Sequence, residues 1–407
     1  MRRDSKLPSL IVCLLLVLLL IPTSNVAGAS PIQLDSISLS FPNPQQGYVL
    51  SLYDCVTKTC AALRSTVDAG SSWSVVPIPS QLVRRLQLES WGTYGTTYAT
   101  LTVHFADAKD GWIYGTVPAP VTPTTASPNS VSRLWSTHNG GKTWQQVRLD
   151  PLSLTYGVIQ MATHGKWTYL FGGSVTTSRE YLLGTRSNVD QWSSKSSAEM
   201  GMPAGGTQLV GSFTFAGGNG WFVAGNDRGF TANARLLPDG SWGAWNGPSF
   251  ESFGSSFTPI DAVTNRVLLA EGQSAGIVYP PASSVPSGWN NGASWLFISY
   301  DAGATFKPLR KISSTYQGSY YSIVPGLPAT PVPGTILHQQ ASNSSYHMVR
   351  STNWGRTWSV VLDDSVSQVL FTSRTIGFAI AKERSSQATF SVFRTIDAGR
   401  YWNKVSL

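Results

Sequence analysis

Three pairs of acidic residues lie near one another in the 407-residue sequence and are candidates for acid–base catalysis. The pairs are Asp107 with Asp110, Asp261 with Glu271, and Asp363 with Asp364. Hydrolysis of a glycosidic bond needs two carboxylates that face one another about 5–10 Å apart. Acidic residues at these places are also typical of solvated turns, in which they accept hydrogen bonds from backbone amides. We favour a structural role in solvated turns for all three pairs, and we predict no catalytic residue.

Other reaction chemistry has little support in the sequence. None of the five histidines has the spacing of a metal-binding pair, and the sequence contains neither a nucleophile elbow nor a phosphate-binding loop. We therefore expect no metal and no cofactor. The formal charge of +8 is spread along the chain without a dense basic run, so nucleic acid is not an expected partner.

Aromatic and basic side chains in expected loops are the candidates for binding. Exposed tryptophans can stack on a sugar ring or anchor a protein partner, although a tryptophan can equally fold back on its own loop. The tryptophan candidates are Trp91, Trp289 and Trp354. The loop arginines that could contact an acidic partner are Arg84, Arg85, Arg228 and Arg310.

The N-terminus has the order of a secretory signal peptide. Basic residues precede an apolar stretch over 10–21, and the small residues Ala27, Gly28 and Ala29 follow it. The stretch is shorter than the roughly 20 residues that span a bilayer. We therefore expect a signal peptide over 1–29, one domain over 30–407, and a secreted or extracytoplasmic protein without a membrane span after cleavage. An uncleaved anchor is the alternative.

Two of the three cysteines, Cys55 and Cys60, remain after this cleavage. In an exported chain such a pair predicts a disulfide that closes a short turn. One cysteine pair without a nearby histidine cannot supply the four ligands of a structural zinc.

One turn motif occurs five times. Each copy has Ser or Thr, then Asp or Asn two residues later, Gly four later and an aromatic residue seven later. The last three positions are Asp68, Gly70 and Trp73; Asn139, Gly141 and Trp144; Asp301, Gly303 and Phe306; Asn353, Gly355 and Trp358; and Asp397, Gly399 and Trp402. The Asp or Asn side chain can accept hydrogen bonds from the amides of its own turn, and Gly permits positive φ. The motif therefore predicts a turn between two antiparallel strands.

A second repeat precedes the turn motif and reads as a hairpin that ends in Gly followed by an aromatic residue, as at Gly111-Trp112 and Gly220-Trp221. Two worn copies of the turn motif, at 185–192 and 237–242, bring the number of units to seven. Repeats of this length with four strands each predict an all-β protein. The expected fold is a seven-bladed β-propeller of four-stranded antiparallel blades, with six or eight blades as alternatives.

These turns resemble the Asp-box, or BNR, repeats of the sialidase-like superfamily. The combination of hairpin and turn is closest in pattern to propellers of the photosystem II assembly and stability factor type, within the wider group of WD40/YVTN-like repeats. The sialidases carry an arginine in a Phe/Tyr-Arg-Ile-Pro stretch, which this sequence lacks.

With the signal peptide, the resemblance leads us to expect an exported, monomeric scaffold that binds a protein at the cell envelope, and we favour a scaffold over an enzyme. The alternative is a secreted glycoside hydrolase, or a lectin that binds a polysaccharide.

Overall fold

The computed structural model describes residues 34–407 with internal gaps. The gaps are 56–57, 88–99, 119–129, 149–157, 175–178, 197–209, 217, 226–230, 246–254, 257–259, 263, 265, 275–293, 312–326, 328, 343–344 and 384–388. The expected signal peptide, Trp91, Trp289 and Arg228 lie outside the described residues.

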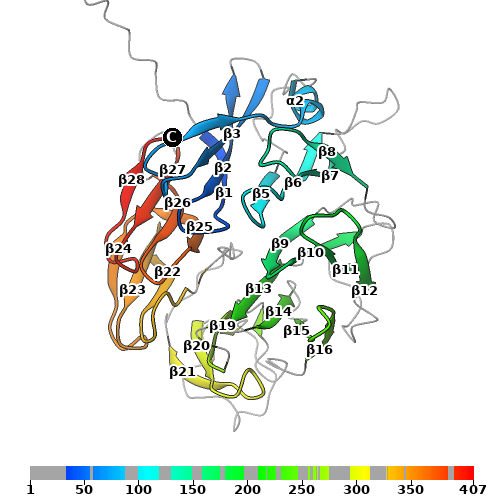
Figure 1. The fold of residues 1–407 in the computed structure, drawn as a ribbon. Coiled ribbons are helices and arrows are strands. Elements are labelled where there is room, and N and C mark those ends of the chain that lie inside the picture. The colour runs from blue at the N-terminus through cyan, green and yellow to red at the C-terminus, as the bar shows by residue number, and fades with distance from the viewer. Residues whose placement is uncertain are drawn as a thin grey trace, which may run out of the picture. The chain divides into compact units, whose positions relative to one another are not determined.

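Seven antiparallel sheets, here called blades 1 to 7, follow one another in chain order (Figure 1). Blade 1 contains β1 (Leu34–Ser40), β2 (Gly47–Cys55), β3 (Lys58–Thr66) and β4 (Ser74–Val76), and blade 2 contains β5 (Thr100–Phe105), β6 (Gly111–Pro118), β7 (Ser130–Thr137) and β8 (Gln145–Val147). Blade 3 contains β9 (Val158–His164), β10 (Trp167–Ser174), β11 (Arg179–Arg186) and β12 (Ser193–Ser196), and blade 4 contains β13 (Val210–Ala216), β14 (Asn219–Gly225), β15 (Thr231–Leu236) and β16 (Trp242–Ala244).

Blade 5 contains β17 (Ser255–Ser256), β18 (Ile260–Ala262), β19 (Leu268–Ser274), β20 (Ser294–Ser299) and β21 (Lys307–Lys311). Blade 6 contains β22 (Ile336–Ser342), β23 (Ser345–Ser351) and β24 (Ser359–Leu362), and blade 7 contains β25 (Ser365–Phe371), β26 (Gly377–Lys382), β27 (Phe390–Thr395) and β28 (Asn403–Val405).

The prediction of a seven-bladed propeller with four-stranded antiparallel blades is confirmed. Two blades depart in detail from four regular strands. In blade 5, the short β17 and β18 both pair with β19. In blade 6, an isolated bridge from Ala329 to Leu337 lies beside the three described strands.

The ring closes between blade 7 and blade 1 through side chains, because β1 belongs to the sheet of blade 1. The side-chain amide of Gln368 accepts a hydrogen bond from the backbone N–H of Leu39 and donates one to its carbonyl, both at 3.0 Å. The ring of Phe41 stacks on that of Phe378, with centroids 3.8 Å apart. Closure therefore depends on these contacts between two complete sheets.

The single helix among the described residues, α2 (Ser80–Gln87), packs against β3 and β6. Leu82 and Leu86 are buried in a core cluster that blades 1 and 2 share. The sequence analysis expected Arg84 and Arg85 in a loop, which is wrong: leucines four residues apart share one helix face and bury it, so the segment is helical. Within the described part of the chain, no helix has the length and apolarity to cross a membrane.

Candidate functional site

The repeated turn motif is built from side-chain to backbone hydrogen bonds. In blade 1, the hydroxyl of Thr66 donates to Asp68 Oδ1 at 2.7 Å and accepts from the amide of Gly70 at 2.9 Å. Asp68 also accepts from the amide and the hydroxyl of Ser72 at 2.9 and 2.6 Å. Hydrogen bonds led by that from Ser72 lower the pKa of Asp68 to about 2. Equivalent bonds recur in the other four copies, so these residues hold the turn together.

Each intact turn also contacts the preceding blade. A Cβ on Gly141 of blade 2 would lie 2.6 Å from Val76 of blade 1. In blade 5, the carbonyl of Ala302 accepts a hydrogen bond at 3.1 Å from the indole of Trp221 in blade 4. The turn motif therefore joins neighbouring blades as well as the two strands of its own blade.

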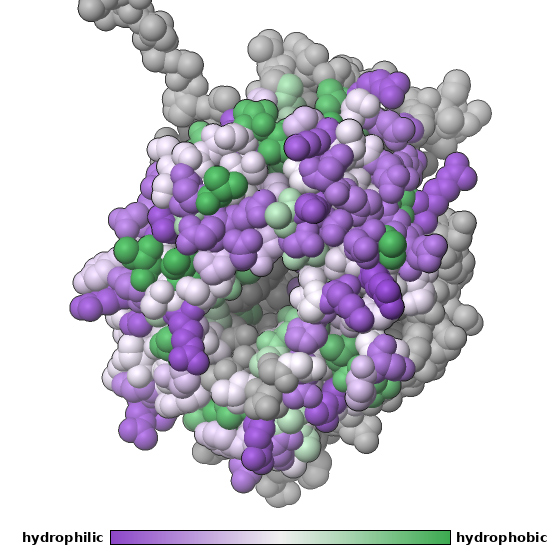
Figure 2. Space-filling model, viewed as in Figure 1, coloured by the Kyte–Doolittle hydropathy of each residue, from purple (hydrophilic) through white to green (hydrophobic). Residues whose placement is uncertain are grey.

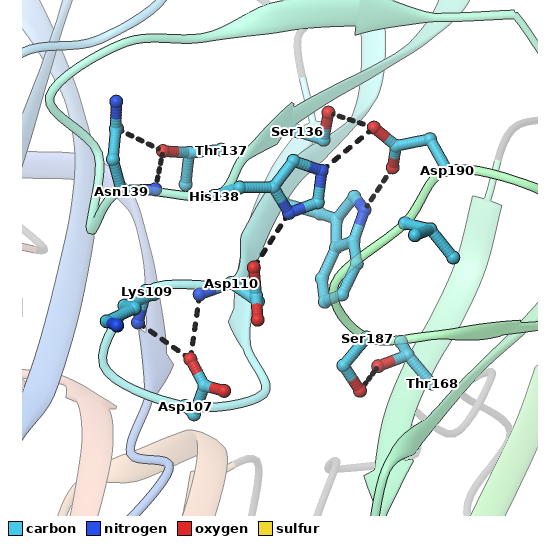
Figure 3. Close-up of polar contacts among 12 residues, drawn as sticks. Asp107, Lys109, Asp110, Ser136, Thr137, His138, Asn139, Thr168, Ser187 and Asp190 are labelled. Carbon is cyan, nitrogen blue, oxygen red and sulfur yellow. Dashed lines mark hydrogen bonds and ion pairs between the residues drawn. The ribbon is translucent and has the colours of Figure 1, made fainter.

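Blade 3 carries a worn copy of the motif, and there a carboxylate makes the contact with the preceding blade (Figure 3). Asp190 accepts hydrogen bonds from three side chains of blade 2: Trp112 Nε1 at 3.3 Å, Ser136 Oγ at 2.7 Å and Gln145 Nε2 at 2.8 Å. A fourth partner is His138 Nε2, at 3.1 Å from Asp190 Oδ2.

His138 links this carboxylate to a second one. Its Nδ1 lies 2.7 Å from Asp110 Oδ1, at the tip of the β5–β6 hairpin. The imidazole thus lies between Asp110 of its own blade and Asp190 of the next, as Figure 3 shows. We call Asp110, His138 and Asp190 the His138 bridge.

Burial and hydrogen bonding shift the pKa of each of the three groups in the bridge. Burial alone would lower the pKa of His138, but hydrogen bonds to Asp110 and Asp190 outweigh it and raise that pKa above 6.5. Burial raises the pKa of Asp110. The pKa of Asp190 is lowered, because its hydrogen bonds, led by that from Ser136, outweigh the effect of burial. The ionised form of Asp190 is therefore the favoured partner of a protonated His138.

A second polar chain crosses between the same two blades. The half-buried His104 of β5 lies with Nε2 2.7 Å from Thr163 Oγ1, which lies 2.9 Å from Thr168 Oγ1. Thr168 in turn lies 2.9 Å from Ser187 Oγ (Figure 3). Burial lowers the pKa of His104 to about 4, so this histidine is neutral in the folded protein near neutral pH.

The bridge does not have the arrangement of a nucleophilic site. Both ring nitrogens of His138 face carboxylates, and the nearby hydroxyl of Ser136 donates to Asp190 instead of to the imidazole. A nucleophile and its base must be hydrogen-bonded to each other. The geometry therefore suits holding a proton and joining two blades.

Sequence analysis did not find the bridge. It grouped Asp110 with Asp107, and it treated the 185–192 turn as having lost its acid. Two features of the sequence could have indicated it. His138 holds the motif position that Val67 holds in blade 1, and Asp190 is an acidic residue within the degraded turn motif at 185–192.

The carboxylate pairs proposed from sequence lie in three places. Asp107 Oδ1 accepts from the amides of Lys109 and Asp110 at 2.7 and 2.8 Å, which is turn chemistry. Asp261 and Glu271 lie on the paired strands β18 and β19. Asp363 and Asp364 lie between β24 and β25, and Asp363 Oδ1 is 3.2 Å from His347 Nδ1.

The described binding candidates lie on different elements. Trp354 occupies the turn of blade 6 with φ of 58° and packs, half-buried, against Leu269, Leu296 and Ile336. Arg84 is exposed on α2 with Arg85 beside it. Arg310, expected in a loop, is instead exposed on β21, because the turn motif before it starts the outer strand there.

The cysteines lie on the β2–β3 hairpin. Cys55 pairs with Lys58, and Cys60 lies two residues further along β3, opposite Tyr53. The disulfide itself stays a prediction.

Comparison with known proteins identifies the fold. No family model matches the chain, and no curated protein matches it. A solved structure of YCF48 bound to D1 peptide is similar with a TM-score of 0.50 and 15% identity, over 90% of this chain and 93% of that one. A polysaccharide lyase of family PL25, an ulvan lyase, is similar with a TM-score of 0.51 and 11% identity, over 89% and 92%. At such identities, the likenesses show the propeller fold, which is shared by proteins of different function.

Proposed function

We propose that the chain is an exported scaffold at the cell envelope that binds an acidic segment of a partner protein through the arginines around α2. The observation that carries the proposal is a group of arginines on a rigid support. Leu82 and Leu86 fix α2 in the core, and Arg84 is exposed beside them.

Arg85 lies near a third arginine. Burial, together with the positive charge of Arg85, lowers the pKa of Arg133 on β7. Arg133 donates to the backbone carbonyl of Ser132 at 2.9 Å. Among the described residues, no carboxylate pairs with Arg84, Arg85 or Arg133. Arginines near one another without a carboxylate favour an incoming anion, and a planar guanidinium suits a carboxylate group.

The face of the protein drawn in Figure 2 agrees with polar recognition. It has a hollow at its centre, and hydrophobic side chains lie scattered in small groups among hydrophilic ones. A partner held at an extended apolar patch would need a continuous hydrophobic area. Charge complementarity is therefore the better basis for recognition on this face.

The similar structures include both a protein that was solved with a bound peptide and a polysaccharide lyase. Within the described residues, the two acids that the His138 bridge brings together are separated by the imidazole itself. The bridge therefore does not present the two facing carboxylates that hydrolysis of a glycosidic bond needs.

Binding of a synthetic glutamate-rich peptide, measured by fluorescence anisotropy, tests the arginine surface. We expect the Arg84→Glu/Arg85→Glu variant to lose most of the affinity, and we expect wild-type affinity to fall as salt concentration rises, because exposed charges are screened. Arg356→Glu/Arg374→Glu, at exposed positions of blades 6 and 7, is the matched control and should bind as wild type does. Equal weakening in both variants would indicate a general charge effect and would contradict the proposed surface.

Export rests on the N-terminal sequence pattern and needs a test of its own. Expression in a host with a cell envelope, followed by fractionation and N-terminal sequencing, should place the protein outside the cytoplasm with Ser30 as its first residue. Affinity capture from the envelope of the native host, followed by mass spectrometry, should then recover a near-stoichiometric protein partner. Recovery of the bait alone, with retention of polysaccharide, would contradict the scaffold.

A further inference from the structure

The contact between blades 2 and 3 differs chemically from the contacts that intact turns make between other blades. At the contact between blades 4 and 5, the turn supplies a neutral backbone carbonyl. Between blades 6 and 7, the carbonyl of Ala398 accepts from Arg350 Nε at 3.0 Å. Between blades 2 and 3, the acceptor is the carboxylate of Asp190, and a titratable imidazole faces it.

We propose that the His138 bridge is a proton-operated lock between blades 2 and 3, tightest when His138 is protonated and weakened when the imidazole loses its proton. The lock is a property of the fold and does not depend on the function proposed above.

The number of N–H groups on the ring gives the mechanism. A protonated imidazole donates from both nitrogens, so it satisfies Asp110 and Asp190 together. A neutral imidazole has one N–H, so one of the two carboxylates then faces a nitrogen lone pair. With contacts of 2.7 and 3.1 Å on opposite sides of the ring, the neutral form cannot keep both carboxylates in place.

Other charged groups surround the bridge. The β5–β6 tip supplies Asp107, whose negative charge contributes to the raised pKa of Asp110, and Lys109. The turn of His138 also carries Lys142. On the blade 2 side, the ring of His104 lies 6.2 Å from that of Trp112.

The direction of the pH effect follows from these groups. Because the folded-state pKa of His138 is raised, its contribution is complete below the ordinary value of 6.5 and is lost as the pH rises through the folded-state pKa. The pKa of Asp190 is lowered, so its contribution is lost only in strong acid. His104 acts in the opposite direction. Its neutral form is favoured in the folded protein, so its contribution to stability is lost as the pH falls from 6.5 to about 4. The test therefore belongs above pH 6, where His138 alone titrates in this group.

Amide hydrogen exchange of the full chain between pH 6 and 9, corrected for the intrinsic rate, measures opening at the contact. We expect the 185–192 turn of the wild-type protein to lose protection by up to about tenfold per pH unit through the transition, the limit for one proton. The 351–358 turn of blade 6 should keep its protection throughout. In His138→Gln, the protection of the 185–192 turn should be lower than in the wild type at pH 6 and should not change with pH. Protection that is independent of pH in the wild type, or a wild-type profile in the variant, would overturn the proposal.

A measurement on the wild-type protein alone covers the case in which His138→Gln fails to fold. With ¹⁵N-labelled histidine, His138 should carry protons on both ring nitrogens at pH 6 and titrate with a midpoint above 6.5. A midpoint at or below 6.5 would mean that the two carboxylates do not hold the proton, and the lock would be rejected.

Discussion

The indole of Trp112 donates a hydrogen bond to the carboxylate of Asp190 in the next blade. Trp221, which holds the same place in blade 4, donates to a backbone carbonyl of an intact turn. The side chain of Asp190 thus replaces a main-chain acceptor where the turn motif has worn away. The repeat has kept the contact between blades and changed the group that makes it.

Removing the charge of Asp190 should destabilise the protein. An asparagine at this position keeps one acceptor oxygen for the four donors that now reach the carboxylate. We expect Asp190→Asn to lower the free energy of unfolding by about 1–3 kcal/mol, the cost of leaving a partly buried donor unsatisfied. Urea denaturation measures this. Asp68→Asn is the matched control and should cost less than Asp190→Asn, since Asn139 and Asn353 hold that motif position in blades 2 and 6. Equal losses in the two variants would contradict a special role for Asp190.

The turn glycine of blade 7 is restricted both by its backbone and by its neighbour. Gly399 has φ of 77°, and a Cβ there would lie 2.6 Å from Leu337 Cδ2 in blade 6. We expect Gly399→Ala to cost about 2–5 kcal/mol, from left-handed backbone strain and overpacking together. Gly165→Ala, at φ of 59° with nothing within 4 Å, should cost only the strain, about 1–2 kcal/mol. Thermal unfolding of both variants separates the two effects, and the same loss in each would show that contact with blade 6 is unimportant.

Loss of the Gln368 amide should loosen the ring where it closes. Gln368→Ala leaves the N–H and the carbonyl of Leu39 without this partner, at an expected cost of about 1–3 kcal/mol. Hydrogen exchange in β1 should increase. Gln339→Ala removes a glutamine whose buried side-chain oxygen has no partner among the described residues, so it should cost less. A ring that closes independently of Gln368 would leave exchange in β1 unchanged.

Acid should weaken the intact turns in a defined range. Hydrogen bonds led by those from Ser72 and Thr305 lower the pKa of Asp68 and of Asp301 from 3.8 to about 2. Each carboxylate therefore stabilises the fold above pH 3.8, and the contribution is lost as the pH falls through about 2. Melting temperatures from pH 5 to 2 should fall less steeply in Asp68→Asn/Asp301→Asn than in the wild type. Parallel curves would contradict this origin of the acid sensitivity.

The predicted disulfide has a direct chemical test. In protein prepared under oxidising conditions, Cys55 and Cys60 should resist alkylation until a reductant is added, and mass spectrometry should then find both thiols labelled. Because the loop between them is short, reduction should lower stability only modestly. Labelling before reduction would exclude the cross-link.

Sequence reasoning recovered what is local and repeated. Asp68, Gly70 and their equivalents form turns through hydrogen bonds that span four residues or fewer, so their spacing carries the full signal. It missed the His138 bridge because Asp110 and Asp190 lie 28 and 52 residues from His138 and meet only in the assembled ring. It missed α2 for a similar reason, since the face carrying Leu82 and Leu86 is buried against two different blades.

Because every blade is built from consecutive strands, each sheet can form as soon as its last strand leaves the ribosome. No blade waits for a strand from the opposite end of the chain, as β1 stays in the sheet of blade 1. Only the contacts between blade 7 and blade 1 must form last, and among the described residues these include Gln368 with Leu39 and Phe41 with Phe378. New termini placed at any link between two blades would therefore leave all seven sheets unbroken, which makes the chain suitable for circular permutation.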